Sequence, residues 1–177
     1  MMIQRTRHSM PMTRIAAAST DLVVGMGAGL VAAWAMNLFQ TAWIRLADEP
    51  EPEETAASRA ADVILERTSG APIKDSAKKS ADAVLHYVTG ALIGGAYGLI
   101  GGHFPKLFEG RGLFFGAGIW LLADEMAVPM LRLGPPPAET EGEVKDHALG
   151  FSSHLVFGAA MDAARRYTNA LISPPSP

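Results

Sequence analysis

The sequence predicts an all-α polytopic membrane protein with four transmembrane helices in an antiparallel bundle, plus a short extramembrane amphipathic helix. Apolar residues make up 49% of the 177-residue chain and form long runs, while the charged residues, 19% of the total, gather between those runs. Eighteen glycines, many inside the apolar runs, suit close helix–helix contact in lipid. One run, 112–137, is long enough to cross a bilayer although it contains Asp124 and Glu125.

Composition also narrows the function classes. A net charge of −3 and a pI near 5.9 give no electrostatic reason to expect nucleic-acid binding. The chain has no cysteine, so it has no disulfides and no thiolate nucleophile. It also lacks a nucleophile elbow, a phosphate-binding loop and a dinucleotide-binding motif. We therefore expect a non-enzymatic protein without a cofactor.

The first predicted span covers residues 22–44, which carry no charge and follow a basic tail at 1–20. The apolar run is too long for a signal peptide, whose apolar region has about 7–15 residues, so we expect an uncleaved transmembrane helix. Gly25 and Gly29 are four positions apart, the spacing of a small-residue packing face.

A polar loop at 45–82 separates the first two spans and contains a predicted helix at about 55–68. Its acidic, proline-containing beginning, 48–54, favours an extended linker. In the helix, apolar residues recur at the spacing of one helical face. They are Ala57, Ala60, Ala61, Ile64 and Leu65. This helix either lies on the membrane surface, docks a partner, or packs over the end of the bundle.

The second and third predicted spans are rich in glycine. The second covers 83–104 and presents a ridge formed by Gly90, Gly94 and Gly98. A short connection leads to the third, 113–131, which begins with the small-residue pair Gly112 and Gly116. Pro129 lies near the end of the third span. Because proline has no amide hydrogen, we expect a kink there that deprives the Glu125 carbonyl of its helical donor.

The fourth predicted span, 147–164, is the least hydrophobic, and an Asp162–Arg166 pair at its end accounts for the charge of that aspartate. The transmembrane domain thus covers 21–168, followed by a tail at 169–177 whose composition indicates disorder. Four spans place both termini on one side of the membrane. Lys and Arg are divided almost equally between the two sides, but the short basic flanks near the termini favour a cytoplasmic location for both.

Five ionisable side chains fall in the outer third of three of the predicted spans. They are Asp124, Glu125, His86, His154 and His147. Charged groups at membrane depth cost about 2.5–3.5 kcal/mol each on insertion scales, so they need a polar interior or a partner. Helical rise places Glu125, His154 and His86 within about 10 Å of the outer ends of their spans. We therefore expect an intramembrane His/carboxylate cluster.

Three interpretations of this cluster remain open. It is a proton or cation site, because intramembrane ionisable residues often mark such pathways and histidine titrates near neutral pH. It holds a metal, or His86 and His154 ligate a haem between helices, although no local ligand motif points to this and we predict no metal site. Or it is structural, with carboxylates that accept hydrogen bonds and hold the bundle together.

From the second span onward, the chain resembles the YagU-like family of small bacterial inner-membrane proteins. The similar stretches are HYVTGALIGGAYGLI (His86–Ile100), GRGLFFGAGIWLLADEMAVPMLRLGPPP (Gly110–Pro137) and SSHLVFGAAMDAARR (Ser152–Arg166). The resemblance implies an inner-membrane location, a cytoplasmic N-terminus and a link to acid tolerance. It supplies no established activity.

The sequence therefore predicts a non-enzymatic protein of the bacterial inner membrane, an accessory subunit or an envelope or acid-stress factor with an intramembrane His/carboxylate cluster. The alternative is a small proton- or cation-conducting channel or transporter that uses this cluster. The expected partners are the lipid bilayer and either further copies of the chain or a larger membrane-protein complex.

Overall fold

The computed structural model describes residues 11–48, 55–70, 74–101, 110–133 and 143–172. Every regular element within these ranges is helical, which confirms the all-α prediction. In chain order the elements are α1 (Pro11–Ala47), α2 (Ala56–Ser69), α3 (Asp75–Gly101), α4 (Leu113–Trp120), the π-helix η2 (Leu121–Ala127), α5 (Val128–Met130) and α6 (Glu143–Ile172).

Within the described ranges, three helical segments are long and apolar enough to cross a membrane. They cover Ile15–Ala47, Asp75–Gly101 and Leu113–Met130. Large apolar side chains on their outer faces are exposed; Val23 is 66%, Leu92 63% and Phe114 77% accessible. Soluble monomers rarely expose contiguous apolar surface on this scale, so lipid is the environment that fits these faces. The segment α6 does not meet the same criterion of length and apolarity.

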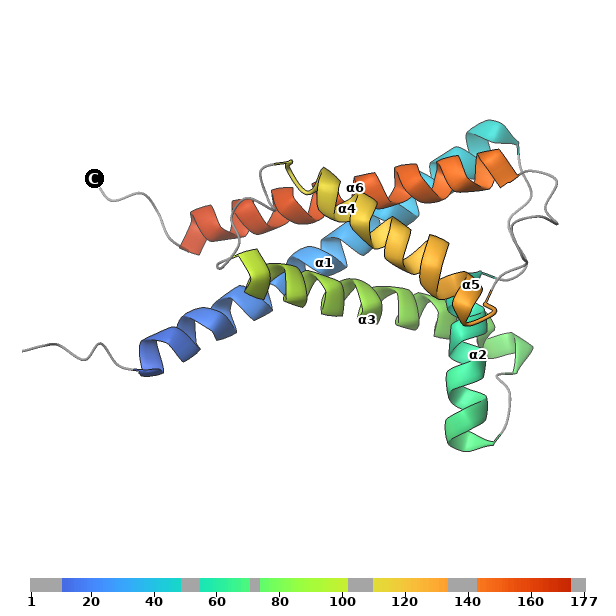
Figure 1. Ribbon diagram of the computed structural model, residues 1–177, viewed down its shortest axis with the longest axis horizontal. Helices are drawn as coiled ribbons and strands as arrows, with labels where there is room; N and C mark the ends of the chain where they lie inside the picture. The colour runs from blue at the N-terminus through green and yellow to red at the C-terminus, as the bar shows by residue number, and fades with distance from the viewer. Residues whose placement is uncertain (1–10, 49–54, 71–73, 102–109, 134–142, 173–177) are drawn as a thin grey trace, which may run out of the picture.

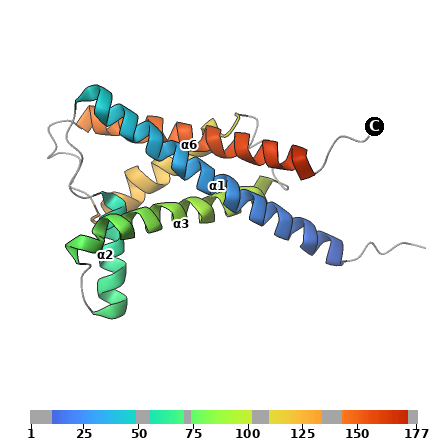
Figure 2. The ribbon, with the colours of Figure 1, turned by 180° about the vertical axis from the view of Figure 1, so that it is seen from behind.

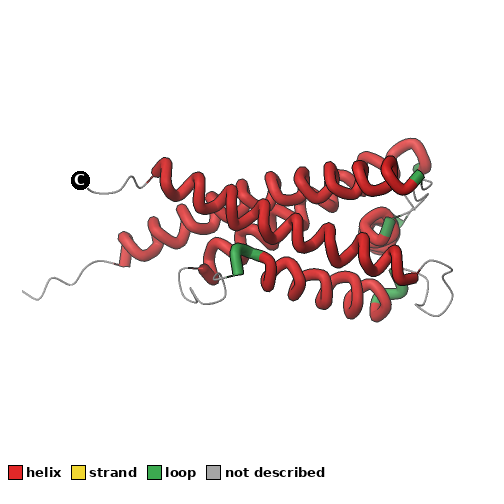
Figure 3. Tube along the Cα trace, turned by 90° about the horizontal axis from the view of Figure 1, so that it is seen from above, coloured by secondary structure: helices red, strands yellow, loops and turns green. Residues whose placement is uncertain are grey.

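The long helices pack side by side with alternating direction. α1 packs against both α3 and α6, while α4 packs against α6. α1 and α3 run in opposite directions, and so do α1 and α6 (Figures 1 and 2). The first turn of α1 and the last turn of α6 consequently lie toward the same end of the molecule (Figure 1). A view from above shows the same grouping of long helices (Figure 3).

Glycines bring the main chains of α1 and α3 into direct contact. A Cβ atom on Gly25 would overlap the carbonyl oxygen of Gly94, and one on Gly29 would overlap that of Gly90. Gly98 lies in the same way against the carbonyl of Asp21. The two backbones make dispersion contacts with each other in place of the contacts that larger side chains would make. Each dispersion contact is weak, but the many contacts together stabilise the helix pair.

A second glycine contact joins α4 to α6. Gly116 faces the carbonyl oxygen of His154, and Gly112 faces that of Gly158. Gly112 precedes α4 with φ 78°, a left-handed conformation that residues with a Cβ rarely adopt. This position therefore requires glycine both for its backbone conformation and for its close approach to α6.

Small side chains fill the core between these contacts. Ala32, Ala33, Tyr97 and Met161 are fully inaccessible, and Phe157 is nearly so. Tyr97 packs edge-on against Phe115 with 4.6 Å between ring centroids. The core is therefore a thin layer of alanine and glycine around a few large side chains.

α2 lies crosswise at one end of the long helices (Figures 1 and 3). Thr55 and Ser58 form a reciprocal capping box at its N-terminus, and Gly70, with φ 75°, ends the helix. The Thr55 hydroxyl also donates a hydrogen bond to Asp82 of α3, and Arg59 Nη1 donates one to the Leu133 carbonyl at 3.1 Å. These contacts attach α2 to both α3 and the chain that follows α5.

The elements extend beyond several of the expected boundaries. α1 begins at Pro11, inside the stretch expected as a tail, and α3 begins at Asp75, eight positions before the expected span. α6 continues to Ile172. Residues 1–10, 102–104 and 173–177, which belong to the expected tails and second span, lie outside the described residues.

The glycine contact between α1 and α3 generates a first prediction. Gly94→Ala should lower the midpoint of thermal unfolding in detergent, because its Cβ would overlap the Gly25 carbonyl and approach Gly29 Cα at 2.7 Å. Overpacking of this kind costs about 1–3 kcal/mol. Gly27→Ala on α1 is the control, since nothing lies within 4 Å of its added Cβ. Equal midpoints for the two variants would contradict the proposed main-chain contact.

Candidate functional site

The acidic pair lies in a π-helical turn. Residues Leu121–Ala127 form η2, which contains Asp124 and Glu125, between the α-helical turns of α4 and α5. The amide of Val128 donates to the carbonyl of Ala123, five residues earlier. π-turns are rare and occur frequently at functional sites. The expected irregularity near Pro129 thus extends over a wider helical turn that includes both carboxylates.

The backbone hydrogen bonds change their spacing across this turn. The Val128 amide donates to the Ala123 carbonyl, five residues earlier, and the Leu131 amide donates to the Ala127 carbonyl, four residues earlier, at 2.9 Å. Three carbonyls, those of residues 124–126, lie between the two acceptors, whereas Pro129 has no amide hydrogen to offer. The backbone around the acidic pair therefore offers more acceptors than helical donors, and such groups at membrane depth require protein or water contacts.

Glu125 pairs with His147. His147 Nδ1 lies 2.7 Å from Glu125 Oε1, and the two side chains are 40% and 27% accessible. Trp120 packs edge-on against the His147 ring, with 6.5 Å between centroids, and against Phe151 at 5.0 Å. This half-exposed pair ties η2 to the first turns of α6.

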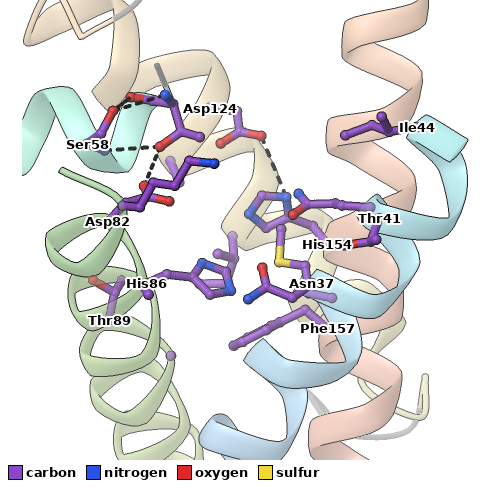
Figure 4. Close-up of a pocket in the computed structure, with 18 of the residues that line it drawn as sticks. Asn37, Thr41, Ile44, Ser58, Asp82, His86, Thr89, Asp124, His154 and Phe157 are labelled. Atoms are coloured by element: carbon purple, nitrogen blue, oxygen red, sulfur yellow. Dashed lines mark hydrogen bonds and ion pairs between the residues drawn. The ribbon is translucent and has the colours of Figure 1, made fainter. Parts of the chain in front are cut away.

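Asp124 pairs with His154 further along α6. Asp124 Oδ2 lies 3.6 Å from His154 Nδ1, and the same nitrogen lies 2.9 Å from the Gly150 carbonyl (Figure 4). Because a carbonyl oxygen only accepts hydrogen bonds, Nδ1 carries the proton. The His154 side chain is 11% accessible against 38% for Asp124, so the imidazole is the more buried member of the pair.

A cavity of about 610 Å³ adjoins the Asp124–His154 pair. Its volume falls within the range of small-molecule sites. Because α1 and α3 run in opposite directions, the positions of the lining residues along these helices divide the lining into three layers. The outer layer, at the end of the molecule where α2 lies, is formed by Arg45, Thr55, Ser58, Lys78, Lys79 and Asp82. The middle layer contains Asn37, Gln40, Thr41, His86, Thr89, Asp124 and His154. The inner end is largely apolar and is formed by Met36, Gly90, Ile93, Ile119 and Phe157.

Side chains from different helices face one another across the middle layer. His86 extends from α3 and His154 from α6, and Asn37 of α1 lies between them (Figure 4). His86 Nε2 lies 3.2 Å from the Ala33 carbonyl and therefore donates to it. In each of the two cavity histidines, one ring nitrogen thus donates a hydrogen bond to a backbone carbonyl. This hydrogen bond fixes the orientation of the ring.

The structure brings together three of the five predicted cluster residues. Asp124, His86 and His154 line the cavity, whereas Glu125 and His147 form their own pair and do not line it. In the part of the chain that the structure describes, no three His, Asp or Glu side chains are arranged to hold a metal ion.

A second polar cluster lies on the other side of Phe157, and it contains the Asp162–Arg166 pair predicted from the sequence together with Tyr97 and Arg165, which were not predicted to join it. The Tyr97 hydroxyl donates to Asp162 Oδ1 at 3.1 Å, and Arg166 Nε donates to Asp162 Oδ2 at 2.6 Å. Arg165 lies over the Tyr97 ring, 5.8 Å from its centroid. The available signal was Tyr97 itself, which carries a hydroxyl into an otherwise small and apolar stretch, GGAYG.

Comparisons with protein-family models, curated proteins and solved structures return no match for this chain. The resemblance to the YagU-like family therefore stays a prediction. What defines the class of protein here is the structure alone. It is a helical protein in which segments long and apolar enough to cross a membrane adjoin a polar, ionisable cavity.

The second polar cluster generates a prediction about stability. Tyr97→Phe should lower the unfolding midpoint in detergent by an amount equivalent to about 1 kcal/mol, because a buried hydrogen bond to a charged group is lost while Arg166 still pairs with Asp162. Tyr167→Phe is the matched control, since that tyrosine is 69% exposed. A Tyr97→Phe protein as stable as the control would show that this hydrogen bond contributes nothing measurable.

Proposed function

We propose that this chain is a non-enzymatic, four-span protein of the bacterial inner membrane that binds and releases protons in the cavity beside Asp124 and His154. The observation that carries the proposal is the position of this pair on the wall of a cavity of about 610 Å³, between segments apolar enough to cross a membrane. Ionisable groups inside membranes are costly and commonly mark proton pathways, and histidine changes charge near neutral pH.

The packing of α6 supports a fourth span. This helix lies against α1 and α4 and runs opposite to α1 (Figure 1). If α1 crosses the membrane, a helix packed along it occupies the same layer. The polar side chains of α6 then need protein partners, and His147, His154 and Asp162 each have one. Four spans, basic terminal flanks and the resemblance to the YagU-like family together favour cytoplasmic termini and the inner membrane.

The inner end of the cavity favours an accessory or stress-related role over conduction by a single chain. Phe157, which lines the cavity, is 3% accessible, and the fully buried Met161, which does not line it, follows one turn further along α6. The Asp124 side chain is 38% accessible, so protons can reach it, whereas Phe157 and Met161 are buried. Such a protein would act as an acid-stress factor or as a subunit of a homo-oligomer or larger complex, in which protonation changes its contacts.

A second candidate, a proton or cation channel or transporter, is favoured by the Tyr97–Asp162–Arg166 cluster. Asp162 is eight residues after His154 on α6, which corresponds to about 12 Å along the helix axis. Polar groups therefore occur on both sides of the Phe157–Met161 layer. Rearrangement of these two side chains would connect the two polar regions.

Infrared difference spectroscopy tests proton binding at Asp124. Lipid-reconstituted protein compared at acidic and neutral pH should show bands from protonated carboxyl groups. One of them should be missing in Asp124→Asn and retained in Glu125→Gln, because Asp124 lines the cavity and Glu125 does not. The neighbouring residue thus serves as the matched control. Identical difference spectra for the wild type and Asp124→Asn would refute proton exchange at this site.

Proton flux in proteoliposomes separates the two candidate functions. For the purified chain we expect no flux above that of empty liposomes under an imposed pH gradient, because Phe157 and Met161 close the inner end of the cavity. Purification in mild detergent should also recover further copies or partners in fixed stoichiometry. Flux that Asp124→Asn abolishes and Glu125→Gln preserves would instead establish a channel or transporter.

A further inference from the structure

α2 has an orientation that differs from that of every long helix. It lies across the end of the molecule, and its C-terminal half extends beyond the edge of α3 (Figures 1 and 2). The N-terminal half is fixed by the Thr55–Asp82 and Arg59–Leu133 hydrogen bonds. If α3 crosses the membrane, a helix attached crosswise at its end runs along the membrane surface.

One face of α2 is buried in the N-terminal half of the helix and exposed in its C-terminal half. Ala61, in the half that packs against α3, is 7% accessible. Ile64 and Leu65 follow at the i+3 and i+4 positions and so share this face, yet they are 52% and 40% accessible. The face that covers protein at Ala61 therefore continues, still apolar, past the edge of the protein.

The helix to which α2 is attached, α3, also carries an exposed apolar surface. Val84, Val88 and Leu92 form an apolar stripe on α3, with 63%, 48% and 63% of each residue accessible. A face of α2 that is directed toward the spans at Ala61 is directed, beyond the bundle edge, toward the lipid that surrounds that stripe. Glu66 and Arg67 are exposed on α2 as well and suit the aqueous side or the phosphate layer.

We propose that α2 is an interfacial helix whose C-terminal half rests on the bilayer, with Ile64 and Leu65 inserted at the boundary between headgroups and acyl chains. Helices of this kind bury an apolar face about 5–10 Å into that boundary. The inference rests on the membrane location in the proposed function and adds a lipid-binding element to it. Because Thr55 and Ser58 also line the cavity, the proposal places the outer layer of the cavity at headgroup level.

Spin labelling can test this directly, since the chain has no cysteine and each introduced cysteine is the only labelling site. Full-length Ile64→Cys and Glu66→Cys proteins would carry a nitroxide label in liposomes of phosphatidylcholine and phosphatidylglycerol. Leu92→Cys on α3 is the reference for lipid exposure. Power saturation then measures collision with oxygen, which concentrates in lipid, and with a water-soluble nickel chelate. All three positions are accessible, so folding should tolerate the labels.

We expect the ratio of oxygen collision to nickel-chelate collision to be several-fold higher at Ile64 than at Glu66. The ratio at Ile64 should approach the ratio measured at Leu92. Equal, nickel-dominated ratios at Ile64 and Glu66, with Leu92 in lipid, would overturn the interfacial helix and leave the proposed function intact. Low collision with both reagents at Ile64, with dipolar broadening between labels, would overturn it in favour of a second copy covering this face. A nickel-accessible Leu92 would contradict the membrane location and with it both proposals.

Discussion

Contact between glycine main chains determines how the long helices diverge. α1 and α3 touch where Gly25 and Gly29 face Gly94, toward the N-terminal part of α1. α4 and α6 touch where Gly112 and Gly116 face α6. Both pairs separate toward the α2 end, as the ribbon shows for α1 and α3 (Figure 1). Two helices in main-chain contact at one end and crossing at an angle must leave space at the other, and this space is the cavity.

The polar chemistry of the protein is placed where that space is available. Near the glycine contacts, the polar side chains bond to one another: Tyr97 and Arg166 both donate hydrogen bonds to the buried Asp162. At the open end, Asp124 and His154 meet at 3.6 Å beside a cavity, a looser arrangement than the 2.7 Å Glu125–His147 pair. A buried carboxylate that accepts hydrogen bonds from two partners, as Asp162 does, stabilises packing, whereas one with access to a cavity can exchange protons. The separation between the helices thus determines whether an aspartate in this protein stabilises packing or can exchange protons.

Sequence patterns predicted the features that depend on one helix at a time. Uncharged runs indicated membrane-crossing helices, and glycine spacing indicated which positions could pack closely. Features that depend on two helices were harder to predict from the sequence. Similar depth indicated that His86, His154 and Asp124 could meet, but not that His86 holds the Ala33 carbonyl or that Glu125 pairs with His147. The Tyr97–Asp162 bond joins residues 65 positions apart, and no local pattern encodes it.

The π-turn explains how two adjacent carboxylates can both find partners on one neighbouring helix. In an α-helix, consecutive side chains project about 100° apart, so a single facing helix can rarely serve both. A π-turn has more residues per turn, which brings Asp124 and Glu125 closer to a common face. His147 and His154 are seven positions apart and therefore share one face of α6. The wider turn thus converts one acidic dipeptide into two carboxylate–histidine pairs, of which only the Asp124–His154 pair borders the cavity.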